Sequence, residues 1–209
     1  MNCKSGNWIK RRHDEVKKAW MTLFKRVSPT VTLEPFLGSP DGMKKKSTTR
    51  DLEARCDLLA TGILRPGCLS MFDVAVIDTF AASYEHRKSI DVLRDKEKKK
   101  IDKYEERVAA IGGVFAPLVC SVTGVLAPEA MKVLSLVVHD LDVEMPEMKS
   151  TAKMLQVSLQ IAILKATSLG LRARARTVPP KSAAPKSLLD CPVSLADARP
   201  LSDDAASAL

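Results

Sequence analysis

The sequence predicts an α/β fold, because helix-like and strand-like segments alternate along residues 8–172. Helices are indicated by apolar residues that recur at helical spacing, and strands by short, nearly continuous apolar runs between them. In order, these segments read α-β-β-β-α-β followed by two further helices. Hydrophobic residues make up 45% of the 209-residue chain, enough to bury a core.

The N-terminal half is expected to hold one helix and three strands. The helix is expected over residues 10–27, and its apolar stripe includes Val16 and Trp20. Pro29 ends this helix, because proline disfavours helical geometry in the preceding residue. Pro35 interrupts the first strand, which is typical of a strand end or a sheet edge. The third strand is apolar on both sides of Asp73, which indicates a strand covered on both faces. The three strands are expected over residues 31–37, 55–61 and 69–77, the last two joined as a hairpin.

The C-terminal half is expected to hold three helices and one strand. A long charged helix over residues 86–110 ends at a Gly-Gly pair that suits a helix C-cap. A strongly apolar strand follows over residues 114–122. Pro128 suits the first turn of a helix that reaches about residue 139, and a last helix is expected over residues 149–172. From residue 173 to residue 209 the chain holds five of its twelve prolines and no regular period, so we expect a disordered tail.

Several classes of protein are disfavoured by composition. Aromatic residues make up 4% of the chain, which does not suit a platform of several rings for stacking bases. No apolar run approaches the ~20 residues of a membrane-spanning helix, so we expect no membrane partner. The five cysteines are widely spaced and form no CxxC pair, so we expect neither a disulfide scaffold nor zinc, and no organic cofactor.

The location of the protein is expected to be intracellular. No hydrophobic signal segment follows Met1, which indicates a reducing compartment. Residues 1–27 hold eight Lys and Arg against two acids, so an organellar presequence is an alternative. Asp14 and Glu15 make that alternative weaker, because such presequences are poor in acids.

Positive charge is concentrated in the first half of the chain. Residues 1–107 hold 23 Lys and Arg against 16 Asp and Glu, a net charge of +7, whereas residues 108–209 hold 10 against 9, a net charge of +1. The basic half is therefore the expected face for a polyanion such as a nucleic acid. A solvated, lysine-rich surface without a ligand is the alternative.

Three acidic residues form the candidate metal site. An ionised Asp73 within an apolar strand would be costly to bury unless a cation meets it, and Asp57 has a similar setting in the neighbouring strand. Paired strands can bring these two carboxylates to one edge, with Glu34 as a third ligand for a hard divalent cation such as Mg²⁺. Carboxylate-bound Mg²⁺ suits the hydrolysis of phosphodiesters. Structural ion pairs of Asp57 and Asp73 with Lys or Arg are the alternative.

The charged helix that follows supplies candidate cations. Lys100 and Tyr104 share one face, one helical turn apart, with Lys96 and Lys103 along that face. A lysine there could reach a metal-bound water or a scissile phosphate, whereas Lys98 points away and belongs to a solvated face. We therefore expect one lysine of this helix to contribute to catalysis, and a solvated charged helix is the alternative interpretation for most of them.

An ordered set of short motifs carries a resemblance to a known family. Over residues 3–172 the chain resembles the restriction-like endonuclease region found downstream of the reverse transcriptase in non-LTR retrotransposon-type proteins. The motifs are RRHD (11–14), LEP (33–35), ARCDLLATG (54–62), FDVAV (72–76), SY (83–84), EKKK with KY (97–104), FAPLVCSVTGV (115–125) and AILKATSLGLR (162–172).

The resemblance implies a restriction-endonuclease-like PD-(D/E)xK core: an α-β-β-β-α-β order with a mixed sheet flanked by helices, plus two C-terminal helices. By this resemblance Asp57 stands at the first aspartate of the motif and Asp73 at its second acid. Glu34 matches the acid of the first helix–strand segment, and Lys100 matches a lysine on the following helix. The implied catalytic residues are Asp57, Asp73 and Lys100, and the implied metal ligands are Glu34, Asp57 and Asp73.

The chain departs from the family pattern at several positions. Ala75 occupies the lysine position of the motif, and Cys56 replaces the proline before the first aspartate. In the family a zinc knuckle lies upstream, so residues 1–7, with Cys3, resemble a remnant of that region. The resemblance also implies that Arg12 and His13 form a DNA-binding or packing element.

Two functions follow as expectations. The first is a retroelement-derived, nuclear domain that binds nucleic acid, DNA rather than RNA, and hydrolyses its phosphodiesters with Mg²⁺. The second is a domesticated, catalytically inactive nucleic-acid-binding or structural subunit of a larger assembly with protein partners. A third alternative, a protein-interaction module over residues 128–172, requires an exposed apolar patch there. The residues expected to bind nucleic acid are Arg11, Arg12, His13, Lys44, Lys45, Lys46, Lys96, Lys98, Lys99 and Lys103.

Overall fold

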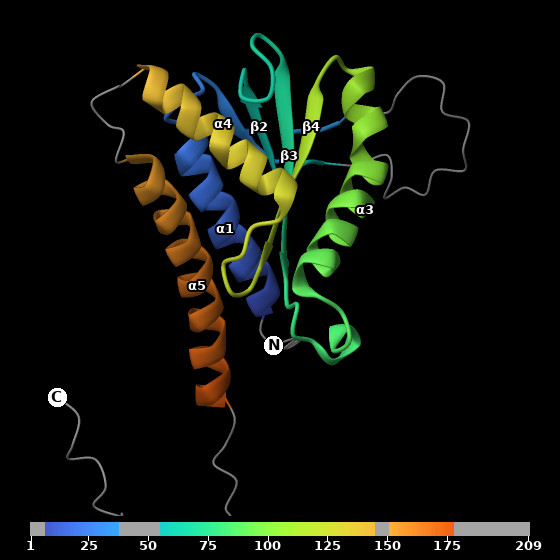
Figure 1. Ribbon diagram of the computed structural model, residues 1–209, viewed down its shortest axis with the longest axis vertical. Coiled ribbons are helices and arrows are strands. Elements are labelled where there is room, and N and C mark those ends of the chain that lie inside the picture. The colour runs from blue at the N-terminus through green and yellow to red at the C-terminus, as the bar shows by residue number, and fades with distance from the viewer. Residues whose placement is uncertain (1–6, 38–54, 145–150, 178–209) are drawn as a thin grey trace, which may run out of the picture. The chain divides into compact units, whose positions relative to one another are not determined.

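The computed structural model describes residues 7–37, 55–144 and 151–177. Over these ranges the elements follow the predicted order, and an additional single-turn helix, η2, precedes the long charged helix (Figure 1). The elements are α1 (Trp8–Phe24), β1 (Val31–Leu33), β2 (Leu58–Thr61), β3 (Leu69–Ile77), η2 (Ala82–Tyr84), α3 (Ser89–Ala110), β4 (Val114–Ser121), α4 (Pro128–Glu144) and α5 (Thr151–Thr177).

The four strands form one mixed sheet in the order β1-β2-β3-β4. The first two pairs are antiparallel, and β3 pairs with β4 in parallel. A parallel pair needs a crossover connection, and here α3 supplies it. The α/β class, the mixed sheet and the predicted β2–β3 hairpin are confirmed.

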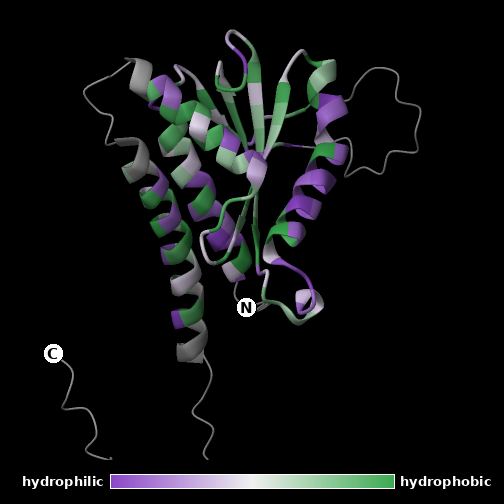
Figure 2. Cartoon of the chain, viewed as in Figure 1, coloured by the Kyte–Doolittle hydropathy of each residue, from purple (hydrophilic) through white to green (hydrophobic). Residues whose placement is uncertain are grey.

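Helices cover both faces of the sheet (Figure 1). On one face, Phe72 and Val74 of β3 pack into a core with side chains of α1, α4 and α5, where Trp20 and Phe24 are fully buried. The residues of β3 that alternate with these, Met71 and Ala75, pack instead into smaller clusters with side chains of α3. Hydrophobic residues line the strands, and α3 is largely hydrophilic along its length (Figure 2). Asp73 lies between Met71 and Ala75 and so belongs to the face under α3.

The first strand ends earlier than its apolar pattern predicts. It stops at Leu33 because Glu34 adopts a left-handed backbone conformation, with φ of 51°. Few residues other than glycine adopt this conformation, and such strained positions often belong to functional sites. After Glu34, an isolated bridge joins Phe36 to Arg55, so this part of the chain pairs again after an interruption at Glu34.

The two C-terminal helices are longer than expected. α4 continues to Glu144, and α5 continues to Thr177, so residues 173–177 are helical, contrary to the predicted start of the tail at residue 173. This stretch, ARART, contains the good helix formers alanine and arginine and no proline, which explains the extension. The rest of that predicted tail, residues 178–209, and residues 1–6 of the predicted remnant lie outside the described residues. None of the helices in the described ranges is both long enough and apolar enough to span a membrane.

Glu97 connects α3 to the start of α4. It is buried, and its carboxylate accepts hydrogen bonds from the backbone N–H groups of Glu129, at 2.8 Å, and Ala130. These are the first free N–H groups of the helix, since Pro128 has none. Burial raises the pKa of Glu97, and the two backbone hydrogen bonds oppose that rise. A side chain of α3 therefore caps α4.

We predict that Glu97→Ala lowers the free energy of unfolding by about 1 kcal/mol, because α4 loses its N-terminal cap. Glu97→Gln should lose less, since its amide oxygen can still accept a hydrogen bond. Urea unfolding followed by circular dichroism measures the difference. Glu105→Ala, an exposed change on the same helix, is the control. Equal stability of the Glu97→Ala and Glu105→Ala variants would contradict the capping role.

Candidate functional site

Asp57 and Asp73 lie close together on neighbouring segments of the sheet. Asp57 is the residue just before β2, and the register of β2 with β3 ends at Leu58 opposite Phe72. The backbone N–H of Asp57 donates to the carbonyl of Phe72 at 2.9 Å, and its Oδ2 atom accepts the backbone N–H of Val74, so Asp57 lies against the stretch of β3 that holds Asp73. The charge of Asp57 accordingly contributes to the raised pKa of Asp73. The sheet therefore brings together the two carboxylates that the sequence pattern singled out.

Asp73 is a buried carboxylate paired with Lys100. Its residue is 4% exposed, and the ammonium of Lys100 forms an ion pair with its Oδ2 atom. Tyr104, one turn after Lys100, also hydrogen-bonds to Asp73, and Lys103 donates to the Tyr104 hydroxyl at 2.9 Å. Burial raises the pKa of Asp73, Lys100 and Tyr104 oppose this, and the nearby charge of Asp57 adds to the rise.

At the position of β3 where the resemblance expects a lysine the chain carries Ala75, and the lysine beside Asp73 comes from α3. Two residues after Asp73 on the same face, Ala75 is buried in an apolar cluster with Leu93, Val119 and Ala127. A lysine at this position would place its methylene chain and charged ammonium group among those apolar side chains. The small alanine leaves room for α3 to pack closely, and Lys100 reaches Asp73 from there.

Asp57 has the opposite electrostatic setting. Its Oδ1 atom lies 3.0 Å from Nε2 of His13, and its Oδ2 atom accepts the backbone N–H of Val74 at 2.7 Å. Burial alone would raise its pKa. The hydrogen bond and charge of His13, the Val74 N–H and the charge of Lys17 lower it overall. The two neighbouring carboxyl groups thus have pKa values shifted in opposite directions, an arrangement that active sites use to separate the roles of two acids.

Lys17 of α1 was not predicted as part of the site. Its ammonium lies 2.8 Å from Glu34, 3.7 Å from Asp14 and 4.0 Å from Asp57. Burial alone would lower its pKa, but the bond to Glu34 and the surrounding carboxylates raise it, and Lys17 in turn lowers the pKa of Glu34. The sequence feature that could have indicated Lys17 is its position four residues after His13, which places both side chains on the same helix face.

The carboxylates do not form a three-ligand group in this arrangement. Among the described residues, no three His, Cys, Asp or Glu side chains lie close enough to hold one metal ion together. Glu34 is bound to Lys17 and its side chain is 58% exposed, so its role as a third ligand stays a prediction. Mg²⁺ at Asp57 and Asp73 likewise stays a prediction, and a pair is the smaller set it would need, because this ion is commonly held by one or two carboxylates together with substrate phosphates and waters.

The residues expected to bind nucleic acid occupy different environments. Lys98, Lys99 and Lys103 are exposed on α3, and Lys96 is half-buried. Arg11 is exposed, with its guanidinium 5.0 Å from the ring centre of Trp8. The neighbouring residues Arg12 and His13 turn inward: Arg12 is buried and His13 contacts Asp57. Lys44, Lys45 and Lys46 lie outside the described residues.

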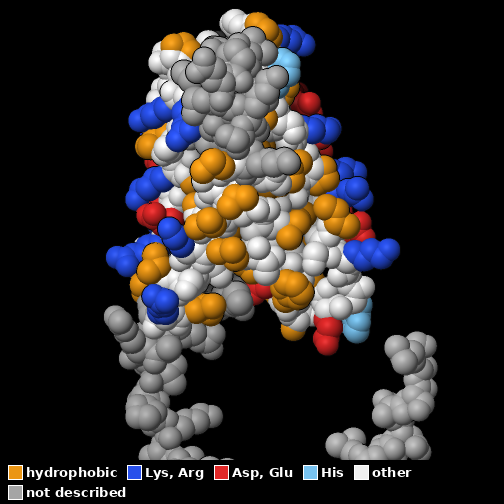
Figure 3. Space-filling model, turned by 60° about the vertical axis from the view of Figure 1, so that its left-hand side comes forward, with side chains coloured by type: hydrophobic (Ala, Val, Ile, Leu, Met, Phe, Trp, Pro, Cys, Tyr) orange, Lys and Arg blue, Asp and Glu red, His pale blue; other side chains and the backbone are white. Residues whose placement is uncertain are grey.

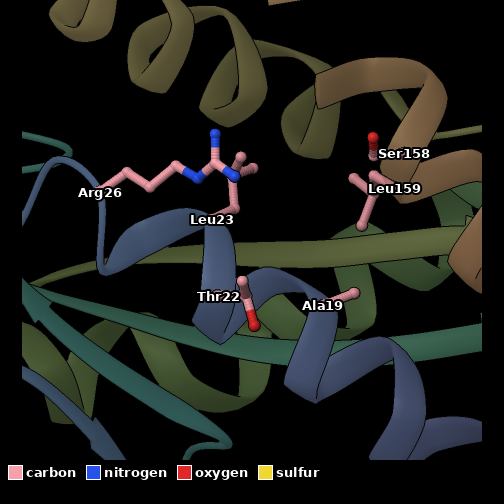
Figure 4. A pocket seen from close by; sticks show the side chains of 6 residues that line it. All are labelled: Ala19, Thr22, Leu23, Arg26, Ser158 and Leu159. Atoms are coloured by element: carbon pink, nitrogen blue, oxygen red, sulfur yellow. The ribbon is translucent and has the colours of Figure 1, made fainter. Parts of the chain in front are cut away.

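Hollows along α1 and α5 lack the chemistry of the Asp57–Asp73 site. One cavity of about 220 Å³ is lined by side chains from α1 and the residues just after it, and from α5 (Figure 4). Arg26 is the charged side chain in its lining, which is otherwise small or apolar. A larger hollow of about 580 Å³ lies between Trp8 and Arg172 and mixes acidic, basic and apolar groups. Neither includes a residue of the carboxylate pair.

No protein-family model matches the chain, and no curated protein matches its sequence.

We predict that Lys100→Met lowers the free energy of unfolding by about 3–5 kcal/mol, because it leaves the Asp73 carboxylate buried without its cation. Asp73→Asn should be less damaging. The side chain of Lys100 is 20% exposed, against 6% for Asp73, so the freed ammonium can reach water. Urea unfolding of both variants and of the double variant measures the coupling. Additive effects in the double variant would show that the two groups do not interact.

Proposed function

We propose that this chain is a nuclease-like domain that binds DNA and hydrolyses phosphodiester bonds with Mg²⁺ at Asp57 and Asp73. The observation that supports this most directly is the placement of a lysine, Lys100, against Asp73, a buried carboxylate that lies close to the carboxylate of Asp57. The resemblance to restriction-like endonucleases agrees with this combination of residues.

Each of the three residues has a distinct role in this proposal. Asp57 and Asp73 hold the ion, which when bound activates water and stabilises charge on the phosphate. Lys100 has three N–H donors, so it can remain bonded to Asp73 and still donate to a phosphate oxygen. A donor held in place before the reaction stabilises the charge that develops in the transition state. Tyr104 and Lys103 position this end of α3 through their contacts with each other and with Asp73.

A second candidate function is nucleic-acid binding without cleavage. It is favoured by the engagement of both carboxylates with groups of the chain itself: His13 and the Val74 N–H on Asp57, and Lys100 on Asp73. Internal cations and hydrogen-bond donors of this kind compete with a metal ion for the carboxylates. In this alternative the charged cluster stabilises the domain, and the exposed lysines of α3 bind phosphates.

A protein partner is a further proposal, supported by the surface of α5. Met154, Val157, Ile161 and Leu164 are exposed and recur at spacings of three and four residues, as in a helix–helix seam. Hydrophobic side chains gather on the face of the molecule that carries α4 and α5, with Lys and Arg toward its margins (Figure 3). Patches of this kind mark interaction surfaces.

We predict that the protein nicks supercoiled plasmid in Mg²⁺ and that Asp73→Asn reduces the rate by about 100-fold or more, because a metal ligand and its charge stabilisation are lost. EDTA should abolish nicking by the wild-type chain. Lys100→Ala should reduce the nicking rate similarly with little loss of DNA binding.

The control for this assay is Asp102→Asn, the same chemical change at an exposed position of α3. Thermal melts establish that each variant is folded at the assay temperature. Equal rates for the wild type and Asp73→Asn would contradict the proposed centre. Absence of nicking together with DNA binding would support the non-catalytic candidate.

We also predict that DNA binding weakens steeply with salt, because each neutralised phosphate releases counterions. Replacing both exposed lysines, Lys98→Gln with Lys99→Gln, should reduce the slope of log affinity against log salt by about 1 per lysine. Fluorescence anisotropy at several salt concentrations measures this slope, and Lys25→Gln, an exposed change at the end of α1, is the control. An affinity independent of salt would exclude the electrostatic mode.

A further inference from the structure

A cavity of about 320 Å³ opens beside the carboxylate pair, at the carboxyl end of β3. It lies among α1, the end of β3, η2 and α3, and its lining includes His13 and Lys100, which contact Asp57 and Asp73. In α/β sheets, ligands commonly bind outside the carboxyl ends of strands. The cavity is thus directly adjacent to the proposed catalytic centre.

Cations predominate in the lining of this cavity. Arg12, Lys96 and Lys100 contribute three positive charges, against one carboxylate from Asp78. Lys100 is paired with Asp73, but no ion pair joins Lys96 to any carboxylate within the described ranges. Burial and the repulsion of Lys100 lower the pKa of Lys96. An anion in the cavity would relieve that repulsion.

Arg12 gives a second, independent indication of an anion. The residue is 8% exposed, and its Nε–H has no hydrogen-bond partner in the part of the chain that the structure describes. The charge of Asp78 compensates the guanidinium in part. A buried donor without an acceptor is unfavourable, and arginine is well suited to bind phosphate oxygens.

The remaining lining suits a nucleotide rather than a free inorganic ion. Tyr84 of η2 adds an aromatic ring to the same cavity, and rings of this kind stack against bases of single strands. The volume lies near the lower end of the ~300–1,000 Å³ typical of small-molecule sites. It therefore matches one nucleotide and not a length of duplex.

We infer that this cavity binds one nucleotide of a single DNA strand, with its phosphate on Arg12 and Lys96 and its base against Tyr84. The inference rests on the proposed function, since the bound nucleotide would neighbour the phosphodiester at Asp57 and Asp73. It makes single-stranded or unpaired DNA the substrate class of the centre.

The test is calorimetric titration of the full chain with deoxyadenosine 5′-monophosphate in EDTA, which requires no metal at the carboxylates. We expect binding by the wild type and a loss of about tenfold in affinity for Lys96→Gln, as for a charge-assisted hydrogen bond. Tyr84→Leu should also weaken binding, and Lys25→Gln should leave it unchanged. Lys96→Gln replaces a half-buried side chain, so it tests the site even where a variant of the buried Arg12 does not fold.

Three results would overturn this inference: no binding by the wild type at millimolar ligand, equal affinity of the wild type and Lys96→Gln, or equal affinity for unphosphorylated deoxyadenosine. The plasmid assay separates the two proposals. Nucleotide binding without nicking would support the nucleotide site and contradict the hydrolytic function. Nicking without nucleotide binding would support the hydrolytic function and contradict the nucleotide site.

Discussion

The buried charge of Asp73 is the constraint on which the surrounding structure depends. Its position in the middle of β3 places a carboxylate under α3, where an unpaired charge would be unfavourable by several kcal/mol. The ion pair with Lys100 and the hydrogen bond from Tyr104 meet this requirement. Lys100 and Tyr104 lie on successive turns of α3, so the packing of α3 on β3 also positions the two groups that contact Asp73. The small side chain of Ala75 permits the close approach of α3 to β3.

The second carboxylate is held by a different helix. α1 supplies His13 to Asp57, and one turn later Lys17 to Glu34 and Asp57. The β1–β2 side of the sheet is therefore tied to α1 by charge, and apolar side chains of α1 also pack against the sheet. Since α1 and α3 each control one aspartate, the distance between the two carboxylates depends on both helices. A shift of either helix would therefore change that distance.

The same two helices also form the cavity at the end of β3. Arg12 is adjacent to His13 on α1, Lys96 lies one turn before Lys100 on α3, and all four residues line the cavity. On each helix, a group that contacts one of the aspartates therefore lies close to a further cation of the cavity lining. The chain thus balances the two aspartates with its own groups and still leaves positive charge facing the cavity.

The sequence by itself determined the order of the elements, the hairpin and the importance of Asp73, because local signals suffice for these. Apolar periodicity, prolines at helix ends and one charge within an apolar strand all act over a few residues. Helix geometry placed Lys100 on one face with Lys96 and Tyr104, and the family resemblance selected Lys100 among the lysines of that face. The left-handed conformation of Glu34 and the extension of α5 to Thr177 were not predicted, since apolar and proline patterns do not fix where an element stops. Only the tertiary structure decided that Lys17 binds Glu34 and that Arg12 faces a cavity. Those contacts join segments far apart in the chain, and their partners depend on how α1 packs against the sheet.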